Sequence, residues 1–468
     1  MSDDALNIHA SLKKPLGVFA LVMINVIAID NLRTLPFSAE FGLSLVSIYV
    51  LAAIFFLIPV GFAAAELATT WPARGGIYIW IREAFGPRAG FFIIWLQWIY
   101  NVVWYPTALA FILGAFAYLV NPHLFDDRVL FFTSITALFW LATLANCFGM
   151  RISSMISTIG TLIGTLLPMS IIIGLAAYGL LQGHPNELTL SWKALLPNTH
   201  TQDQLPFLVE VIFGLVGIEM SAMHADQVAH PQESYPRAIA WSIMIICTSL
   251  ILSSLAIAGV VPHAQLNVIT GISQALTVFL DQNHLQILHP LLTTLIIMGG
   301  TGGVAAWIIG PTKGLLMAAQ DGLAPQYFSK VNPQGVPVRI LLLQALLFTG
   351  FAYFYIWMPK IESAYVVLTV MTTQLSLWVY IGLFAALWRL RHIAPHRTRP
   401  YRIPGGRFGL IACCALGGIT CLMVIGLGFV PPPMLHDSLA HYAPMIGLGM
   451  ILLCLPPFII SHYTQRKR

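Results

Sequence analysis

Long runs of apolar residues, separated by short polar segments, follow one another along almost the whole chain. A helix needs about 20 predominantly apolar residues to cross a lipid bilayer. The runs predict twelve membrane-spanning helices, at residues 16–38, 44–69, 89–120, 129–148, 153–182, 205–229, 238–262, 289–319, 339–358, 362–390, 408–430 and 442–463. No polar segment is long enough for a separate soluble domain, so we predict a single all-α polytopic membrane protein.

The first apolar run is interrupted by charged residues. Residues 25–37, NVIAIDNLRTLPF, include Asp30 and Arg33, with Pro36 just beyond. A charge at the bilayer centre costs at least about 2.5–3.5 kcal/mol on insertion scales, so such residues usually face protein or water and serve a function. The pattern therefore predicts a break in the first helix that lines a functional space.

The sixth run is interrupted in the same way. Residues 209–231, VEVIFGLVGIEMSAMHADQVAHP, combine small residues with Glu219 and end at a proline. Backbone can leave the helix at membrane depth only where it lines a cavity or packs against protein. Breaks in spans one and six predict two inverted five-helix repeats, at 16–182 and 205–392, with a peripheral pair at 408–463 and short terminal segments at 1–15 and 464–468.

The two breaks suggest a ligand. Exposed N-termini of half-helices attract an anionic group, and freed carbonyl groups attract a cation. A zwitterionic amino acid carries both groups at one end, so it matches the backbone without defining the side chain.

Composition and charge agree with a membrane protein. The chain of 468 residues is 58% hydrophobic and only 9% charged, whereas soluble domains carry about 25% charged residues. The net charge of +5 is spread over short loops, so we expect no nucleic-acid partner. The six cysteines fall within predicted spans without metal-ligand spacing, and we expect no metal and no cofactor.

Basic residues gather in alternate loops. Arg74, Arg82 and Arg88 lie between spans two and three, and six arginines lie within 389–407, between spans ten and eleven. Cytoplasmic loops are enriched in lysine and arginine. We therefore expect a multi-pass protein of the inner cell membrane with both termini in the cytoplasm. Residues 1–15 lack a cleavage site, so no removable signal peptide is predicted.

Several motifs, in order, resemble the amino acid–polyamine–organocation transporter superfamily, and within it most closely the glutamate/GABA antiporters. They are IPVGFAAAELAT (58–69), GGIYIWIREAFGPRAGF (75–91), GIEMSAMHADQV (217–228), AWIIGPTKG (306–314), GVPVRI (335–340) and YRIPGG (401–406). The resemblance implies a LeuT-type fold of 5+5 inverted repeats with peripheral helices eleven and twelve. It also implies alternating access around an amino-acid site near the bilayer midplane.

The resemblance and the polar-aromatic band of the third span together give the candidate residues. For substrate binding they are Ile24, Asn25, Ala28, Asp30, Tyr100, Asn101, Gly214, Gly217, Glu219, Ser221 and Trp307; for gating or coupling they are Arg33, Glu66, Thr158, Glu219 and His224. Ordinary helix packing is the alternative role for Trp307. The other members of the band are Trp98, Trp104 and Tyr105, and helical spacing does not say which of them face the cavity.

The sequence also departs from the family pattern. Thr158 stands where the family has a lysine in the fifth helix, and Gly303 stands where a glutamate is expected in the eighth. Asp30 and Arg33 are additions at the first break. The antiporters carry a C-terminal extension that closes the path at neutral pH, whereas this sequence stops at Arg468, so we expect no such plug. Glutamate/GABA exchange therefore cannot be carried over.

The charged candidates leave alternatives open. Asp30 and Arg33 could form an ion pair that makes a kink tolerable; otherwise Asp30 recognises a polar or cationic group of the substrate, or Arg33 gates the outer vestibule. Glu219 either carries a coupling proton or caps freed amides of the broken helix. Glu66 either pairs with Arg74 or Arg237 in a cytoplasmic gate or is solvated.

We expect a secondary active amino acid transporter, working as an exchanger or a proton-coupled permease. A sodium-coupled symporter is the alternative, with a site built from Thr158 and a group near Thr301. A channel or receptor would show a pore loop or a charged ring, and an enzyme would show a nucleophile motif or a metal cluster; the sequence has none of these signals. The expected partners are an amino acid, membrane lipid and a coupling H⁺ or Na⁺, with the chain as a monomer or homodimer.

Overall fold

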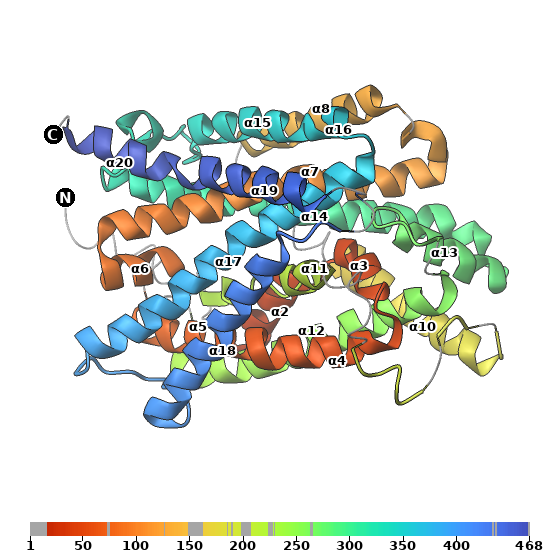
Figure 1. Cartoon of the computed structure of the whole chain (residues 1–468), viewed down its shortest axis with the longest axis horizontal. Coiled ribbons are helices and arrows are strands. Elements are labelled where there is room, and N and C mark those ends of the chain that lie inside the picture. The colour runs from red at the N-terminus through yellow and green to blue at the C-terminus, as the bar shows by residue number, and fades with distance from the viewer. Residues whose placement is uncertain are drawn as a thin grey trace.

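The structure is a computed structural model, and most of the chain it describes is helical (Figure 1). It describes residues 16–72, 75–125, 127–147, 162–184, 186–188, 191–197, 207–222, 228, 230–262, 265–432, 435 and 438–466. Within these ranges, the sole β-type pairing is an isolated bridge between Leu16 and Val228.

The helices of the described chain follow one another with short connections. They are α2 (Val18–Ile29), α3 (Leu35–Ala39), α4 (Leu45–Ala52), α5 (Ile58–Thr70), α6 (Ile77–Phe85), α7 (Pro87–Val120), α8 (Arg128–Cys147), α10 (Leu167–Leu181), α11 (Phe207–Phe213), α12 (Pro231–Val260), α13 (Gly271–Gln282), α14 (His289–Gln320), α15 (Val338–Ala352), α16 (Phe354–Trp357), α17 (Ile361–Ile393), α18 (Gly406–Leu427), α19 (Leu439–Cys454) and α20 (Pro456–Arg466). Short π-helical turns at Ala53–Leu57 and Leu162–Leu166 precede α5 and α10.

Ten helical segments among the described residues are long and apolar enough to cross a membrane, and the bent pair α2–α3 brings the number to eleven. The all-helical polytopic class is confirmed, whereas the predicted count of twelve is not. The difference lies at the sixth predicted span, where α11 has only seven residues and continues into turns rather than helix.

The predicted break of the first span is present. Helix α2 ends at Ile29, Asp30 is extended with ψ 114°, and the chain resumes as a 3₁₀ turn over Leu32–Thr34 and then α3. The Asn31 side chain caps this turn by accepting a hydrogen bond from the Arg33 amide at 2.9 Å. Pro36 fits the first turn of α3 because its missing N–H is not needed there. The two parts diverge by 43°.

The second break follows α11 and depends on Gly217. Residues 214–219 form turns, and Gly217 has a φ of +126°, which side-chain-bearing residues rarely adopt. A Cβ atom at Gly217 would lie 3.3 Å from Cγ1 of Ile29 and 3.5 Å from the Ala28 carbonyl oxygen. The two breaks therefore touch each other inside the bundle.

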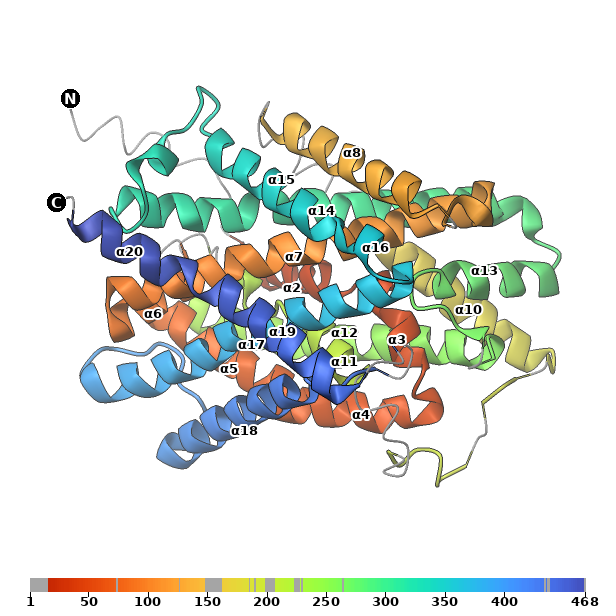
Figure 2. The ribbon, with the colours of Figure 1, turned by 45° about the horizontal axis from the view of Figure 1, so that its top comes forward.

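The interrupted helices lie between two outer layers. In both views, α8 and α15 run along one outer face, α4 and α18 run along the opposite one, and α2 and α11 lie between them (Figures 1 and 2). Of the most apolar stretch of α7 and of α17, 83% is buried, against 17% for Leu439–Tyr463.

Candidate functional site

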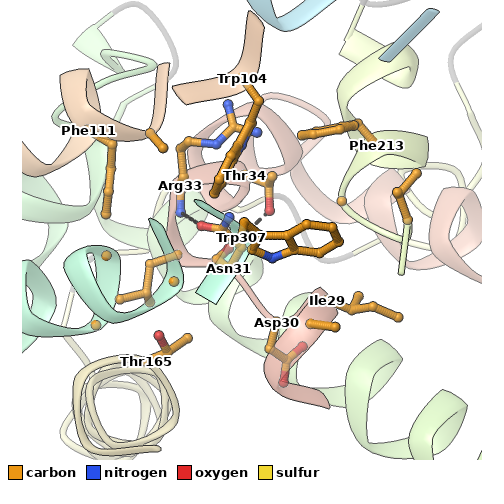
Figure 3. Close-up of a pocket in the computed structure, with 18 of the residues that line it drawn as sticks. Ile29, Asp30, Asn31, Arg33, Thr34, Trp104, Phe111, Thr165, Phe213 and Trp307 are labelled. Atoms are coloured by element: carbon orange, nitrogen blue, oxygen red, sulfur yellow. Dashed lines mark hydrogen bonds between the residues drawn. The ribbon is translucent and has the colours of Figure 1, made fainter. Parts of the chain in front are cut away.

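A cavity lies where the break of α2 meets the end of α11 (Figure 3). Its wall is formed by residues of the first break, of α7, of α11, of α14 and of the π-helical turn that precedes α10. Of the predicted substrate residues, six line it: Ala28, Asp30, Tyr100, Asn101, Gly214 and Trp307. Arg33, predicted for gating, and Trp104, from the polar-aromatic band, also line it.

Asp30 is buried at the edge of this cavity, with 4% of its surface exposed. The hydroxyl Oγ of Ser249, on α12, lies 3.1 and 3.0 Å from the two carboxylate oxygens. That hydroxyl lies equally close, at 3.0 Å, to the carbonyl oxygen of Ile246. One hydroxyl carries one hydrogen, so Asp30 receives at most one hydrogen bond from it.

Arg33 pairs with Glu210 rather than with Asp30. Its Nη2 lies 2.9 Å from Oε1 of Glu210 on α11, and both side chains are almost fully buried. Its Nη1 donates to the hydroxyls of Tyr365 at 3.4 Å and Thr369 at 3.3 Å, both on α17. We call these four residues the Arg33 cluster. The predicted ion pair between Asp30 and Arg33 is wrong, because the turn after Asn31 carries Arg33 toward α11 and α17.

Asn25, Gly217 and Ser221 lie beside the cavity and hold the breaks together. The Asn25 side chain donates to Ser242 Oγ at 3.1 Å and accepts from the Ser221 amide at 3.3 Å. The Gly217 amide donates to the hydroxyl of Tyr380 at 3.0 Å. Amides expected to meet a substrate are thus bonded within the protein. None of these residues lines the cavity, and neither does Ile24.

Glu219 accepts a hydrogen bond from the Tyr380 hydroxyl at 2.8 Å and is 6% exposed. The same hydroxyl accepts from the Gly217 amide, so Tyr380 on α17 links the acid to the break. Glu219 is not among the cavity-lining residues. This contact fastens Glu219 to α17.

Aromatic side chains close the cavity on the side of α7 and α14. The rings of Trp104 and Trp307 lie 6.5 Å apart, centroid to centroid, and meet edge to face (Figure 3). The Tyr105 hydroxyl donates to the Trp307 carbonyl at 2.8 Å, which fixes α7 against α14. The indole Nε1 of Trp104 is buried and has no hydrogen-bond partner among the described residues. Trp98 instead donates to Gln344 at 2.9 Å and packs away from the cavity.

Glu66, in the last turns of α5, is the centre of a second ionic cluster. Its carboxylate accepts two hydrogen bonds from Arg391 at the end of α17 and one from the Ile403 amide at 2.9 Å. Nε of Arg399 lies 3.4 Å from Oε1 of Glu66. The guanidinium groups of neighbouring arginines lie over the ring of Trp71. We call Glu66, Arg391, Arg399 and Ile403 the Glu66 cluster.

The arginines predicted to pair with Glu66 are not the observed partners. Arg237 lies one helical turn from Glu233 on α12, with their charged atoms 3.7 Å apart and both side chains exposed. Arg74 lies outside the described residues. The pair with Arg237 is therefore wrong, although a buried ionic contact of Glu66 is present. Thr158 and His224 also lie outside the part of the chain that the structure describes.

Gly303 lines the cavity from α14, as do Gly299 and Gly300. A Cβ atom at Gly303 would meet nothing within 4 Å, so a side chain there would enter open space. The position where the family pattern expects a glutamate is thus a place where this protein leaves room. Thr301 bonds to the Ile297 carbonyl of its own helix and is exposed, which gives a sodium site no support.

Four functional candidates are missing from the predicted set: Glu210, Ser249, Tyr380 and Arg391. Glu210 carried a usable signal, because it is an acid inside the apolar segment FLVEVIF. Ser249 and Tyr380 look like ordinary helix residues in the sequence, and only folding brings them to the breaks. Among the described residues, no group of three or more histidine, cysteine, aspartate or glutamate side chains could hold a metal ion.

A sequence model described as amino acid permease matches residues 14–454. An uncharacterized transporter of Legionella pneumophila is 48% identical over 96% of this chain and 97% of its own length. A glutamate/gamma-aminobutyrate antiporter of Lactococcus lactis is 27% identical over 97% of this chain and 92% of its own. A "Probable agmatine/putrescine antiporter" of the same species is 25% identical over 89% and 88%. The chain belongs to the amino acid permease family and is a membrane transporter, not an enzyme.

Proposed function

We propose that this protein exchanges amino acids or their amine derivatives across the inner membrane by alternating access, with both termini in the cytoplasm. One observation carries the proposal: two interrupted helices touch inside the bundle and leave a cavity between them. Antiporters among the relatives support exchange. The substrate would lie among Ala28, Asp30, Tyr100, Asn101 and Trp307.

Helix α17 supplies the conformational part of the proposal. It holds Arg33 at the first break through Tyr365 and Thr369, the second break through Tyr380, and the last turns of α5 through Arg391. Opening the cavity toward either side of the membrane requires some of these contacts to separate. In an exchanger, these contacts of α17 separate readily only when a substrate occupies the cavity.

The test is counterflow in proteoliposomes. Purified protein is reconstituted into vesicles loaded with a mixture of unlabelled amino acids and amines, and uptake of single labelled compounds is followed. An exchanger shows uptake stimulated by internal substrate, and replacing sodium with choline leaves it unchanged. Uptake that needs a sodium gradient and no internal substrate would instead establish a symporter. A pH gradient imposed without internal substrate tests proton coupling.

A matched pair of variants ties this activity to the cavity. Gly303→Leu places a side chain into the open space of the cavity and should abolish counterflow. Gly310→Leu makes the same change two turns along α14, at a glycine that also has open space but does not line the cavity. Its activity should stay within twofold of wild type. Equal activity of both variants would place the transport path elsewhere.

A further inference from the structure

The cavity has one carboxyl group that the described protein does not pair with a cation. Its lining contains two ionisable side chains of opposite type, Asp30 and Arg33. The guanidinium of Arg33 is matched one to one by the carboxylate of Glu210, 2.9 Å away. The carboxylate of Asp30 has, among the described residues, only the shared hydroxyl of Ser249. Burying an unpaired carboxylate is costly, so a positive partner would stabilise the charged form of this group.

The backbone around the cavity adds to the negative potential. Helix α2 has twelve residues and ends at Ile29, and α11 ends at Phe213; both end residues line the cavity. The C-terminal end of a helix carries the negative end of its dipole, and a cation there is favoured by about 0.3–1 kcal/mol. Both helices therefore present their cation-attracting ends.

Three amides at the breaks that could meet an anion are already bonded within the protein. The Arg33 amide at the first break is capped by Asn31, the Gly217 amide donates to Tyr380 and the Ser221 amide donates to Asn25. What faces the cavity instead is aromatic. Trp104 and Trp307 line it, and indole faces attract organic cations by about 0.5–2 kcal/mol.

From this charge distribution we propose that the cavity selects a substrate of net positive charge, a basic amino acid or an organic amine, with Asp30 as the counterion of its cationic group. The proposal rests on the transport function proposed above and names its substrate class. A glutamate-like anion would bring a second negative charge beside Asp30. The unpartnered Nε1 of Trp104 is available to donate to a polar atom of the same substrate.

The test compares substrates of different charge in one assay. Labelled arginine, agmatine, alanine, γ-aminobutyrate and glutamate are offered at pH 7.5 to vesicles loaded with the unlabelled mixture of all five. The expected result is uptake of arginine or agmatine at least tenfold faster than uptake of glutamate. Faster uptake of glutamate would overturn the proposal, whereas absence of counterflow for every compound would count against the transport function itself.

Variants of Asp30 separate recognition from folding. Asp30→Asn should lower uptake of the cationic compound at least 100-fold and change alanine uptake much less. Asp30→Glu keeps the charge and should keep the preference. Glu233→Gln makes a carboxylate-to-amide change at an exposed site and should leave both unchanged. If Asp30→Asn does not yield folded protein by gel filtration, the proposal is still tested by the order of uptake rates in the wild type and by whether Asp30→Glu keeps that order.

One rival role for Asp30 is a proton carrier. In that case Asp30→Asn would abolish the response to a pH gradient and leave the order of substrates unchanged, which would overturn the proposal. Thermal-shift binding gives a readout independent of transport. Agmatine should raise the melting temperature of the wild type and not that of Asp30→Asn, whereas equal shifts in both would again overturn it.

Discussion

The two ionic clusters that α17 joins differ in how many partners each acid has. In the Arg33 cluster, one carboxylate meets one guanidinium, and Nε of Arg33 and Oε2 of Glu210 have no hydrogen-bond partner among the described residues. In the Glu66 cluster, one carboxylate meets two arginines and a main-chain amide. Tyr365 and Arg391 are 26 residues apart on α17, which is about 39 Å at 1.5 Å per residue.

The difference suggests which contact gives way first. The Arg33 cluster joins the first break to α11 through a single ion pair and to α17 through two hydrogen bonds of 3.3–3.4 Å, so few bonds must separate for these segments to move. The Glu66 cluster fastens α5 and the chain after α17 through several bonds at once. We expect the first to act as the moving contact in transport and the second to stay closed longer.

Breaking the Arg33 cluster should have the largest effect. Arg33→Gln leaves Glu210 buried without its cation, and breaking a buried pair costs about 3–5 kcal/mol. We expect counterflow to disappear and the melting temperature in detergent to fall more than in any other variant here. The double variant Arg33→Gln/Glu210→Gln should melt higher than Arg33→Gln alone. A double variant that melts lower would show that the pair is not the source of the loss.

Glu66→Gln should rank second. The amide can still accept from one arginine, but charge-assisted hydrogen bonds worth about 1.5–3 kcal/mol are weakened. The arginines lie at the end of α17 and in the following loop, where they can turn toward water. We expect a smaller fall in melting temperature than for Arg33→Gln and an altered ratio of inward to outward substrate affinity. A larger fall than for Arg33→Gln would reverse the ranking of the clusters.

Tyr380→Phe tests the point between the clusters. It removes the hydroxyl that accepts from Gly217 and donates to Glu219, at a cost of about 1–1.5 kcal/mol. We expect counterflow to slow severalfold while the order of preferred substrates is kept, as measured by competition. Tyr355→Phe makes the same change at another buried tyrosine, whose hydroxyl donates to the Pro106 carbonyl at 3.3 Å and belongs to neither cluster, so it is the matched control. Equal slowing in both would remove the special role of Tyr380.

Arg237→Gln should give the smallest effect. Its pair with Glu233 is exposed to solvent, and such pairs contribute about 0.3–0.5 kcal/mol at most. Counterflow and melting temperature should match the wild type within error. A clear loss of transport would show that Arg237 contributes to gating through a contact that this conformation lacks.

The sequence predicted the helices well because lipid imposes a simple rule. Runs of about 20 apolar residues are required in every span, so the boundaries of α7, α14 and α17 could be placed within a few residues. The break at Asp30 was also predictable, since charge and proline do not continue an apolar helix. The break in the sixth span depends on Gly217, which has a positive φ. Several small residues in this segment suggest a break, but they do not show which of them makes it.

The partners of the charged residues could not be predicted. Spacing along one helix favours Asp30 with Arg33, whereas the fold brings Glu210 to Arg33 across 177 positions and Arg391 to Glu66 across 325. Each of these pairs joins different helices, and their meeting depends on how α11 and α17 cross α3 and α5. Residue types are enough to mark a buried charge as functional, but only packing assigns its counterion.

Because there is open space beside Gly303, the length of the accepted substrate can change independently of its charge. Gly303 lies on α14, whereas the acid that sets the sign lies on the first break. Gly303→Ala would add one methyl group to the cavity and leave Asp30 untouched. A single substitution at this position would therefore change the length of the substrate that is accepted and leave the preferred charge the same.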